Sequence, residues 1–336
     1  MTDREQKYKP MVHRTALLVV LLIWPLIWVG GLVTTYDAGM SVPDWPNTYG
    51  YNLLLYPYKT WLLGPFDLFI EHGHRLLGIL VGLAAIGFVV ASFWSEQRRW
   101  VKGLSIVTLL LVIVQGGLGG VRVLLSDRVF AMIHGSTAPV VFATAVGAAV
   151  VTGRWWQRNQ GADETGSADP AVSEGGSLMP KGTLFLVFFL TLICYAQLVL
   201  GAKIRHLQPN DSPVWFLYTV WAHVVVALMI WILAFVAWYR LRKISDLALR
   251  RPGVILVGLT AIQITLGVVT WVVNYGWPSF LQWLPGTNGH LIVSKDFVDA
   301  MLVTGHVATG PLILAAAVVV GLRLLRLQFL SRHSVS

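Results

Sequence analysis

The sequence predicts an all-α polytopic membrane protein in which eight transmembrane helices form two pseudo-symmetric four-helix bundles. Three observations carry this prediction. The 336 residues are 56% hydrophobic and only 12% charged, about half the charged fraction of an average soluble domain. The apolar residues fall in eight runs that each approach the roughly 20 residues needed to cross a bilayer core. A polar, Gly- and Ser-rich segment separates the first four runs from the last four.

The predicted spans follow one another along the chain at residues 15–35, 73–94, 101–121, 129–151, 183–203, 214–239, 253–275 and 297–322. The first follows a basic stretch and shows no small-residue cleavage pattern, so we expect an uncleaved anchor. The polar segment contains GADETGSADPAVSEGGS and is expected to be a flexible linker at 152–182. It divides the chain into an N-terminal half, 1–151, and a C-terminal half, 183–336.

The distribution of basic residues predicts the orientation in the membrane. A net charge of +9 would suggest nucleic acid as a partner of a soluble protein, but here the Lys and Arg residues lie between apolar runs. With the N-terminus inside, eighteen of the 25 Lys and Arg residues are cytoplasmic, as such residues usually are. We therefore expect both termini in the cytoplasm of a bacterial cell, a multi-pass protein of the inner membrane, and no nucleic acid partner. Arg98 and Arg99 are interpreted as part of this topology signal.

The odd-numbered runs contain a short internal repeat. A Gln is followed four residues later by a Gly in QGGLGGVRV (115–123), QLVLGAKIRH (197–206) and QITLGVVTW (263–271). The first two segments also carry an Arg at the outer end of the run. Glycines allow membrane helices to pack closely, and their recurrence indicates a duplicated helical unit.

Four of the nine histidines lie in the even-numbered runs, one in each: His74, His134, His223 and His306. Each lies within about 15 Å of the outer end of its helix. A single membrane histidine is most often a hydrogen-bonding group between helices, but four at one depth indicate a functional site. Imidazole is an axial ligand of haem iron, and facing helices of a bundle can hold such a cofactor. The repeat pairs His74 with His134 and His223 with His306, which predicts two haem sites; zinc is disfavoured because no third ligand recurs nearby.

Charged residues accompany only the first pair. Glu71 lies three residues before His74 and on the same helical face. It could orient a ligand or exchange protons with the reacting group, or it could be an anion at a helix N-terminus. Arg75 could bind a haem propionate or extend to the interface. No Glu stands three residues before His223 or His306, so the two sites are expected to differ.

The run EHGHR, the segment GGLVTTYDAGMSVPDWP after the first span, and the single histidines of the later even-numbered spans resemble the haem A synthase family over residues 15–325. The resemblance implies that the C8 methyl group of haem O is oxidised to a formyl group by successive hydroxylations, for use in terminal oxidases. It implies that His74 and His134 bind the substrate haem O, that His223 and His306 bind a resident haem b, and that Glu71 is the essential carboxylate. Partners would be an electron donor, haem O synthase and the terminal oxidase.

One departure concerns the first outer loop, which lacks the cysteine pair of many bacterial members, because the only cysteine is Cys194. The chain is thus closer to the mitochondrial and proteobacterial branch. In the same loop, the PDWP context predicts a turn at Asp44 and an interfacial anchor at Trp45.

The alternative function is a dihaem b-type electron-transfer protein. Such a carrier typically has two histidines on each of two helices and haems stacked across the bilayer, whereas here each helix has one and all lie at one depth. A repeat transporter would need midplane charges, and a prenyltransferase would need Asp clusters for magnesium. Neither feature is present in the sequence.

Overall fold

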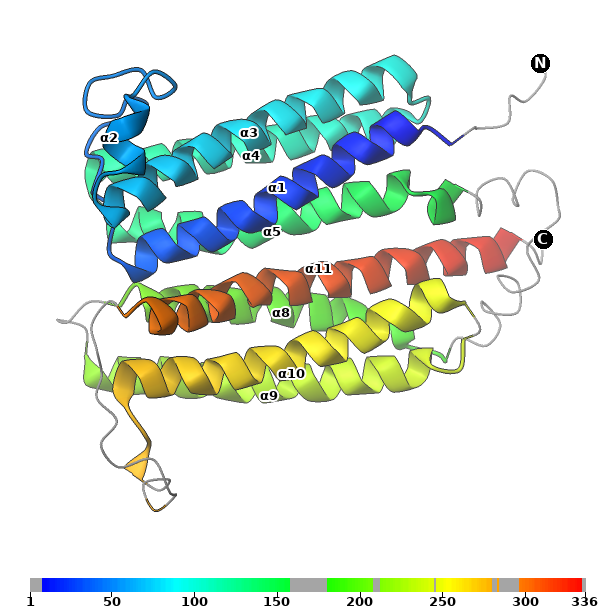
Figure 1. Cartoon of the computed structure of the whole chain (residues 1–336). Coiled ribbons are helices and arrows are strands. Elements are labelled where there is room, and N and C mark those ends of the chain that lie inside the picture. Colours follow the sequence, from blue (N-terminus) through cyan, green and yellow to red (C-terminus); the bar gives the residue numbers. More distant parts are fainter. Residues whose placement is uncertain are drawn as a thin grey trace.

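The computed structural model describes residues 8–157, 180–207, 212–244, 246–279, 283 and 296–333. Within these ranges, eight helices are long and apolar enough to span a membrane, which confirms the predicted number. They are α1 (Pro10–Thr35), α3 (Phe66–Ser95), α4 (Arg99–Leu125), α5 (Arg128–Thr152), α8 (Thr183–Arg205), α9 (Pro213–Leu241), α10 (Leu247–Tyr275) and α11 (Phe297–His333). A short helix, α2 (Tyr58–Leu62), lies in the first outer loop and was not predicted. Figure 1 shows the long helices running side by side.

The helices pack as two groups of four, as the internal repeat predicts. Helices α1, α3, α4 and α5 contact one another around the first group, and α8, α9, α10 and α11 do so around the second. The groups meet where α1 and α5 pack against α8 and α11 (Figure 1). Each group has its own buried apolar cluster. The cluster of the second group also includes Ala143 of α5, and that of the first group includes Ala315 of α11. Residues 158–179 of the predicted linker lie outside the described residues.

The outer surface of the bundle is apolar, as a helix that faces lipid requires. Large side chains such as Leu83, Ile113 and Leu192 are exposed along the middle of their helices. The backbone polar groups are satisfied within the helices, since lipid offers no hydrogen bonds. At two helix starts an aspartate accepts the free backbone N–H groups: Asp127 caps α5 and Asp246 caps α10.

The start of α3 differs from the prediction. The apolar run was expected to begin at residue 73, but the helix begins at Phe66, directly after Pro65. Hydropathy places the boundary too late because Glu71 and His72 are polar, yet both are 1% exposed. They can be buried because the first outer loop folds over this end of the helix and supplies polar partners. Both residues therefore lie on a regular helix, as the helical spacing of Glu71 and His74 predicts although the predicted span began only at residue 73.

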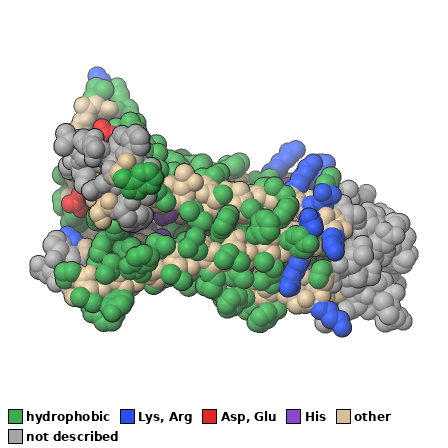
Figure 2. All heavy atoms as spheres, turned by 90° about the horizontal axis from the view of Figure 1, so that it is seen from below, with side chains coloured by type: hydrophobic (Ala, Val, Ile, Leu, Met, Phe, Trp, Pro, Cys, Tyr) green, Lys and Arg blue, Asp and Glu red, His purple; other side chains and the backbone are tan. Residues whose placement is uncertain are grey.

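Basic side chains gather at one end of the molecule. Figure 2 shows Lys and Arg side chains in a band at the end that also holds both chain termini in Figure 1. The opposite end carries the first outer loop and α2. This arrangement agrees with the charge asymmetry of the predicted cytoplasmic and outer loops.

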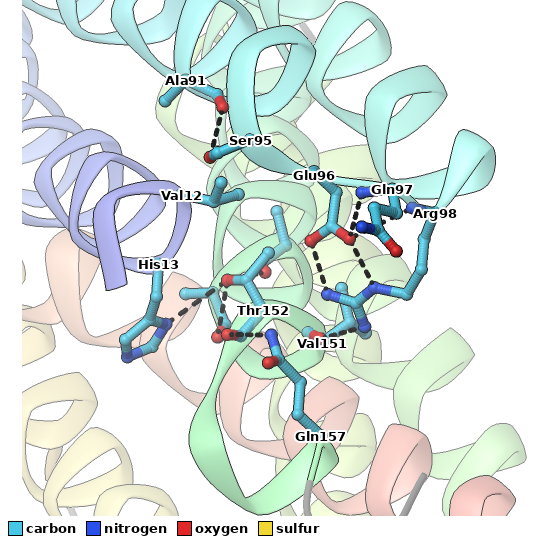
Figure 3. Close-up of polar contacts among 12 residues, drawn as sticks. Val12, His13, Ala91, Ser95, Glu96, Gln97, Arg98, Val151, Thr152 and Gln157 are labelled. Atoms are coloured by element: carbon cyan, nitrogen blue, oxygen red, sulfur yellow. Dashed lines mark hydrogen bonds and ion pairs between the residues drawn. The ribbon is translucent and has the colours of Figure 1, made fainter. Parts of the chain in front are cut away.

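One basic residue at this end is buried and has a structural role that counting charges did not predict. Arg98 is 6% exposed and forms an ion pair with Glu96, with 2.8 Å between Arg98 Nη2 and Glu96 Oε2. It also donates to the backbone carbonyl of Val151, 3.0 Å away, and thereby joins the α3–α4 connection to α5 (Figure 3). Beside it, Nδ1 of His13 lies 3.3 Å from Oγ1 of Thr152, which joins α1 to the same end of α5.

Candidate functional site

The four histidines predicted to act as ligands form two pairs inside the two helix groups. The ring centroids of His74 on α3 and His134 on α5 are 6.4 Å apart, and their ring planes are inclined by 83°. The centroids of His223 on α9 and His306 on α11 are 6.2 Å apart, with an angle of 68°. The structure thus makes the same pairing that the internal repeat predicts.

Each pair has the spacing of two axial ligands on one metal ion. Metal–imidazole bonds are about 2 Å long and each nitrogen lies about 1 Å from its ring centre, so ligands on opposite sides of one ion have centroids about 6 Å apart. Among the described residues, no three His, Cys, Asp or Glu side chains gather as a metal site. Two imidazoles and no further protein ligand are the donor set of a six-coordinate haem iron. The residues present therefore fit a haem at either pair.

A glycine on the neighbouring helix makes room for each of the four rings. A Cβ atom built on these glycines would lie close to Cε1 of the ring: 2.8 Å for Gly30 and His74, 3.1 Å for Gly119 and His134, 3.2 Å for Gly201 and His223, and 3.1 Å for Gly267 and His306. Any larger residue would push the imidazole out of its position. The repeated glycines of the sequence thus serve the histidines as well as helix packing.

An apolar cavity lies in the second group, and neither histidine of the second pair is among its lining residues. It has a volume of about 370 Å³ and lies between α1, α10 and α11. Its lining includes Trp28, Leu266, Met301, Leu302 and Gly305. Apolar walls of this kind suit the edge of a porphyrin or another flat apolar group.

Glu71 is buried and held in a fixed position beside the first pair. Its Oε1 accepts a hydrogen bond from Nη2 of Arg75 at 3.0 Å, and its Oε2 accepts one from the backbone N–H of Val42 at 3.0 Å. The residue lies one helical turn outward from His74, as the sequence spacing predicts. The second pair has valines at the equivalent positions, Val220 and Val303.

Arg75 is directed to the first outer loop. Besides Glu71, its guanidinium donates to three loop carbonyls, those of Val42 (2.8 Å), Asp44 (2.7 Å) and Asn47 (2.9 Å). These contacts make Arg75 the anchor that holds the loop over Glu71. Its role in binding a haem propionate stays a prediction.

The loop itself is shaped by Asp44, which confirms the predicted turn. Its two carboxylate oxygens accept hydrogen bonds from the backbone N–H groups of Tyr49 and Gly50, both of which have positive φ. Partial burial alone would raise the pKa of this carboxyl, but the hydrogen bonds from Gly50 and Tyr49 and the charge of Arg75 lower the pKa below its ordinary value. The turn therefore keeps its anionic cap at neutral pH.

Two further contacts fasten the loop to α4. The Trp45 ring lies against Gly120, where a Cβ atom would come within 2.5 Å of it, and Trp45 is still 41% exposed. The backbone at Gly39 lies against the guanidinium of Arg122. The loop thus covers the outer ends of both α3 and α4.

His72 belongs to this covered region and was placed outside the helix by sequence reasoning. Its Nδ1 lies 3.2 Å from Oγ1 of Thr48. Its ring packs between Tyr56 and Trp61, with centroid distances of 5.2 and 5.1 Å. The aromatic residues of the loop were the only signal that this histidine would be enclosed.

Comparison with known proteins identifies the family. The family model of COX15-CtaA, described as cytochrome oxidase assembly protein, matches residues 13–210. The chain belongs to this family. The match covers the N-terminal group except the first three residues of α1, and it covers the first helix of the second group.

Two similar curated proteins are both named heme A synthase. One, from Alkalihalophilus pseudofirmus, is 28% identical over 207 residues, which cover 60% of this chain and 59% of that protein. The other, from Symbiobacterium thermophilum, is 25% identical over 274 residues, covering 76% of this chain and 82% of that protein. The chain therefore spans less than two thirds of the first relative and most of the second. Membership in the family agrees with a role in cytochrome oxidase assembly.

In this family member, two arginines lie at the outer ends of the helices that carry the repeated Gln and Gly: Arg122 on α4 and Arg205 on α8. Nη2 of Arg205 donates to the carbonyl of Gly31 (2.8 Å) and to Oγ1 of Thr35 (2.6 Å), so α8 is joined to α1 of the other group. Neither Arg205 nor Arg122 has a carboxylate within ion-pair distance among the described residues. The sequence signal for both was their position after a repeated Gln and Gly.

His206, the residue after α8, extends toward the first pair from the second half of the chain. Its Nε2 lies 3.9 Å from the Cβ position of Gly135, which is next to His134. Burial, followed by the charges of Arg205, Arg122 and Arg128, lowers the pKa of His206 to about 4. The ring is therefore neutral at physiological pH. No sequence signal predicted this contact, because His206 lies outside the predicted span 183–203.

Proposed function

We propose that the chain is a haem A synthase that oxidises the C8 methyl group of haem O to a formyl group by successive hydroxylations. The substrate is held by His74 and His134, and a resident haem b by His223 and His306. The observation that carries the proposal is the asymmetry between two otherwise matching pairs: the first has a buried carboxylate one turn away, and the second has valine there. A resident haem b supplies one-electron redox chemistry when bound.

Glu71 is the proposed catalytic residue. Its hydrogen bonds with Arg75 and the Val42 N–H fix the orientation of both oxygens. The loop that supplies the Val42 N–H also excludes water from this side of α3. A carboxylate fixed in this way can accept the proton of one hydroxyl of the geminal diol and deliver it to the other hydroxyl, which leaves as water.

The arginines above the pairs are the proposed partners of the haem carboxylates. Arg122 lies at the outer end of α4 in the first group, and Arg205 at the outer end of α8 beside the second. A guanidinium without a protein carboxylate is suited to bind a propionate by charge-assisted hydrogen bonds. This arrangement would point the propionates of both haems toward the outer side of the membrane.

The depth of the pairs favours this function over that of a dihaem electron carrier. The four histidines lie six to ten residues after the first residues of α3, α5, α9 and α11. At about 1.5 Å per residue, all four lie about 9–15 Å from the same end of the bundle. A carrier that moves electrons across the bilayer needs haems at two depths.

The proposed setting is the inner membrane of a bacterium, with both termini in the cytoplasm beside the basic band. Haem O synthase is the proposed supplier of substrate, and the terminal oxidase the recipient of haem A. An electron donor completes the set of partners. With this orientation, the proposed chemistry lies in the outer half of the bilayer, which is supported by the position of both histidine pairs near the end opposite the basic band.

The test is the haem content of membranes that make this protein together with a haem O source. Extracted haems are separated by reverse-phase chromatography and identified by mass. We expect haem A or its hydroxylated precursor with the wild-type chain, and haem b without haem A with Glu71→Ala. Unchanged haem O beside haem b in the wild type would favour the electron carrier, and haem A in the Glu71 variant would remove Glu71 from the mechanism.

A further inference from the structure

Three of the four histidines are tied to the neighbouring helix by a glutamine side chain. In each case Nε2 of the glutamine donates to the backbone carbonyl of the histidine itself: Gln115 to His134 at 2.7 Å, Gln197 to His223 at 2.9 Å, and Gln263 to His306 at 2.9 Å. Each glutamine stands four residues before the glycine that faces the same ring. The Gln and Gly of the internal repeat therefore form one unit, a seat for the histidine of the next helix.

The seat also orients the imidazole. Nδ1 of His134 lies 3.1 Å from the backbone carbonyl of Gln115, and Nδ1 of His306 lies 3.1 Å from that of Gln263. A carbonyl that accepts from Nδ1 fixes the tautomer in which Nε2 is the free ligand atom. The seat of His134 is the most complete, because Oε1 of Gln115 also accepts a hydrogen bond from Thr137, at 2.8 Å.

The fourth seat, on α1, has the glycine but not the glutamine. Gly30 packs against His74, and the residue four positions earlier is Leu26. A leucine has no donor for the His74 carbonyl, and its side chain packs into the apolar cluster of the first group. Nδ1 of His74 is buried and forms no hydrogen bond among the described residues, and the same holds for Nδ1 of His223, so the missing amide is what distinguishes His74. His74 is thus the one of the four histidines whose backbone carbonyl receives no glutamine amide, and it lies opposite the most firmly tied one, His134.

We propose that Gln115, Gln197 and Gln263 are positioning residues for the haem ligands. His74 lacks such a glutamine because Leu26 stands in its place, and His74 is the ligand that releases the haem iron. A site that exchanges its haem substrate for product needs one histidine that releases the haem iron. A resident haem needs two histidines that both stay bound to the iron. The three glutamines and the one leucine divide the ligands in this way. The inference rests on the proposed function, since it assigns the exchanging haem to the first pair.

The test is the rate at which haem leaves the full-length protein, loaded with haem B at both pairs, for an excess of apomyoglobin. Wild-type protein should lose haem in a fast phase from the first pair and a slow phase from the second. Leu26→Gln should slow the fast phase about fivefold, the factor expected of one net hydrogen bond, and leave the slow phase unchanged. Leu26→Met is the matched control, because methionine has the length of glutamine without its amide, and it should behave as wild type.

The glutamines give the converse measurement. Gln197→Met should accelerate only the slow phase, and Gln115→Met only the fast phase, each about fivefold. The low-spin absorption spectrum, recorded before transfer, reports whether both histidines are bound in each variant. Equal rates for Leu26→Gln and Leu26→Met, or no acceleration in either glutamine variant, would overturn the inference while the proposed function stands. Failure of the wild type to hold haem at either pair would instead overturn the proposed function.

Discussion

Replacing Gly267 by alanine is expected to weaken haem binding at the second histidine pair while leaving α10 intact. The added Cβ would lie 3.1 Å from Cε1 of His306 and 3.6 Å from Nδ1, so the ring has to move by a few tenths of an ångström. A free ring can turn away from the methyl group. A ring bound to iron cannot, because its Nε2 must keep the position that the second ligand, His223, dictates.

The magnitude follows from two opposing effects. Overpacking by one methyl group in a close-packed site costs about 1–3 kcal/mol. Alanine in place of glycine stabilises a helix by about 1 kcal/mol, but this gain is the same with and without haem. The steric cost therefore falls on haem affinity, and a loss of about 1–3 kcal/mol corresponds to a dissociation constant higher by about 5- to 150-fold.

The assay is a titration of haem into the purified apoprotein, followed by the low-spin absorption band. Gly258→Ala is the matched control, because Gly258 lies on the same helix and a Cβ there would meet nothing within 4 Å. The control should bind haem as wild type does. The reasoning is refuted if Gly267→Ala also binds normally, or if both variants lose affinity alike.

Two further predictions concern regions away from the ring contacts. Arg98→Ala leaves the buried Glu96 without its ion-pair partner and should lower the free energy of unfolding by about 3–5 kcal/mol, measured by thermal unfolding in detergent. The same change at the exposed Arg99 should alter the free energy of unfolding by no more than about 0.5 kcal/mol. Equal losses in the two variants would contradict the buried ion pair. The pKa of His206 is lowered to about 4, so between its ordinary value of 6.5 and about 4 the unfolded chain binds a proton that the folded chain does not. The free energy of unfolding should therefore fall as the pH drops through this window, by on the order of 1 kcal/mol at pH 5 after allowing for partial exposure. His206→Gln should remove that part of the pH dependence. If the variant keeps the pH profile of the wild type, the pKa of His206 is not lowered by folding.

Several features of this protein could be predicted from the sequence because they depend on local patterns. The eight spans follow from hydropathy, since a helix in lipid must be apolar along its whole length. The pairing of His74 with His134 and of His223 with His306 follows from their equal depth and from the internal repeat. The position of Glu71 one turn from His74 follows from helical periodicity alone.

Other features depend on contacts between residues far apart in the chain. Hydropathy placed the start of α3 too late, because it counts Glu71 and His72 as polar and does not register the loop that buries them. The same loop determines that Arg75 binds backbone carbonyls, which no charge pattern predicts. Arg98 and Arg99 are identical in sequence terms, and only the packing of α5 against the α3–α4 connection buries one and exposes the other.

The glutamines show where the two kinds of information meet. Their spacing before Gly119, Gly201 and Gly267 was visible in the sequence as a repeat. The repeat does not show which neighbouring residue these side chains face. Only the packing of each odd-numbered helix against the next shows that amide and glycine face the same histidine. The sequence by itself determined the number of spans and the depth and number of the paired histidines, because these follow from hydropathy and helical rise. The tertiary structure decided which histidines receive a glutamine amide and which one does not, because a hydrogen bond between helices exists only once they have packed.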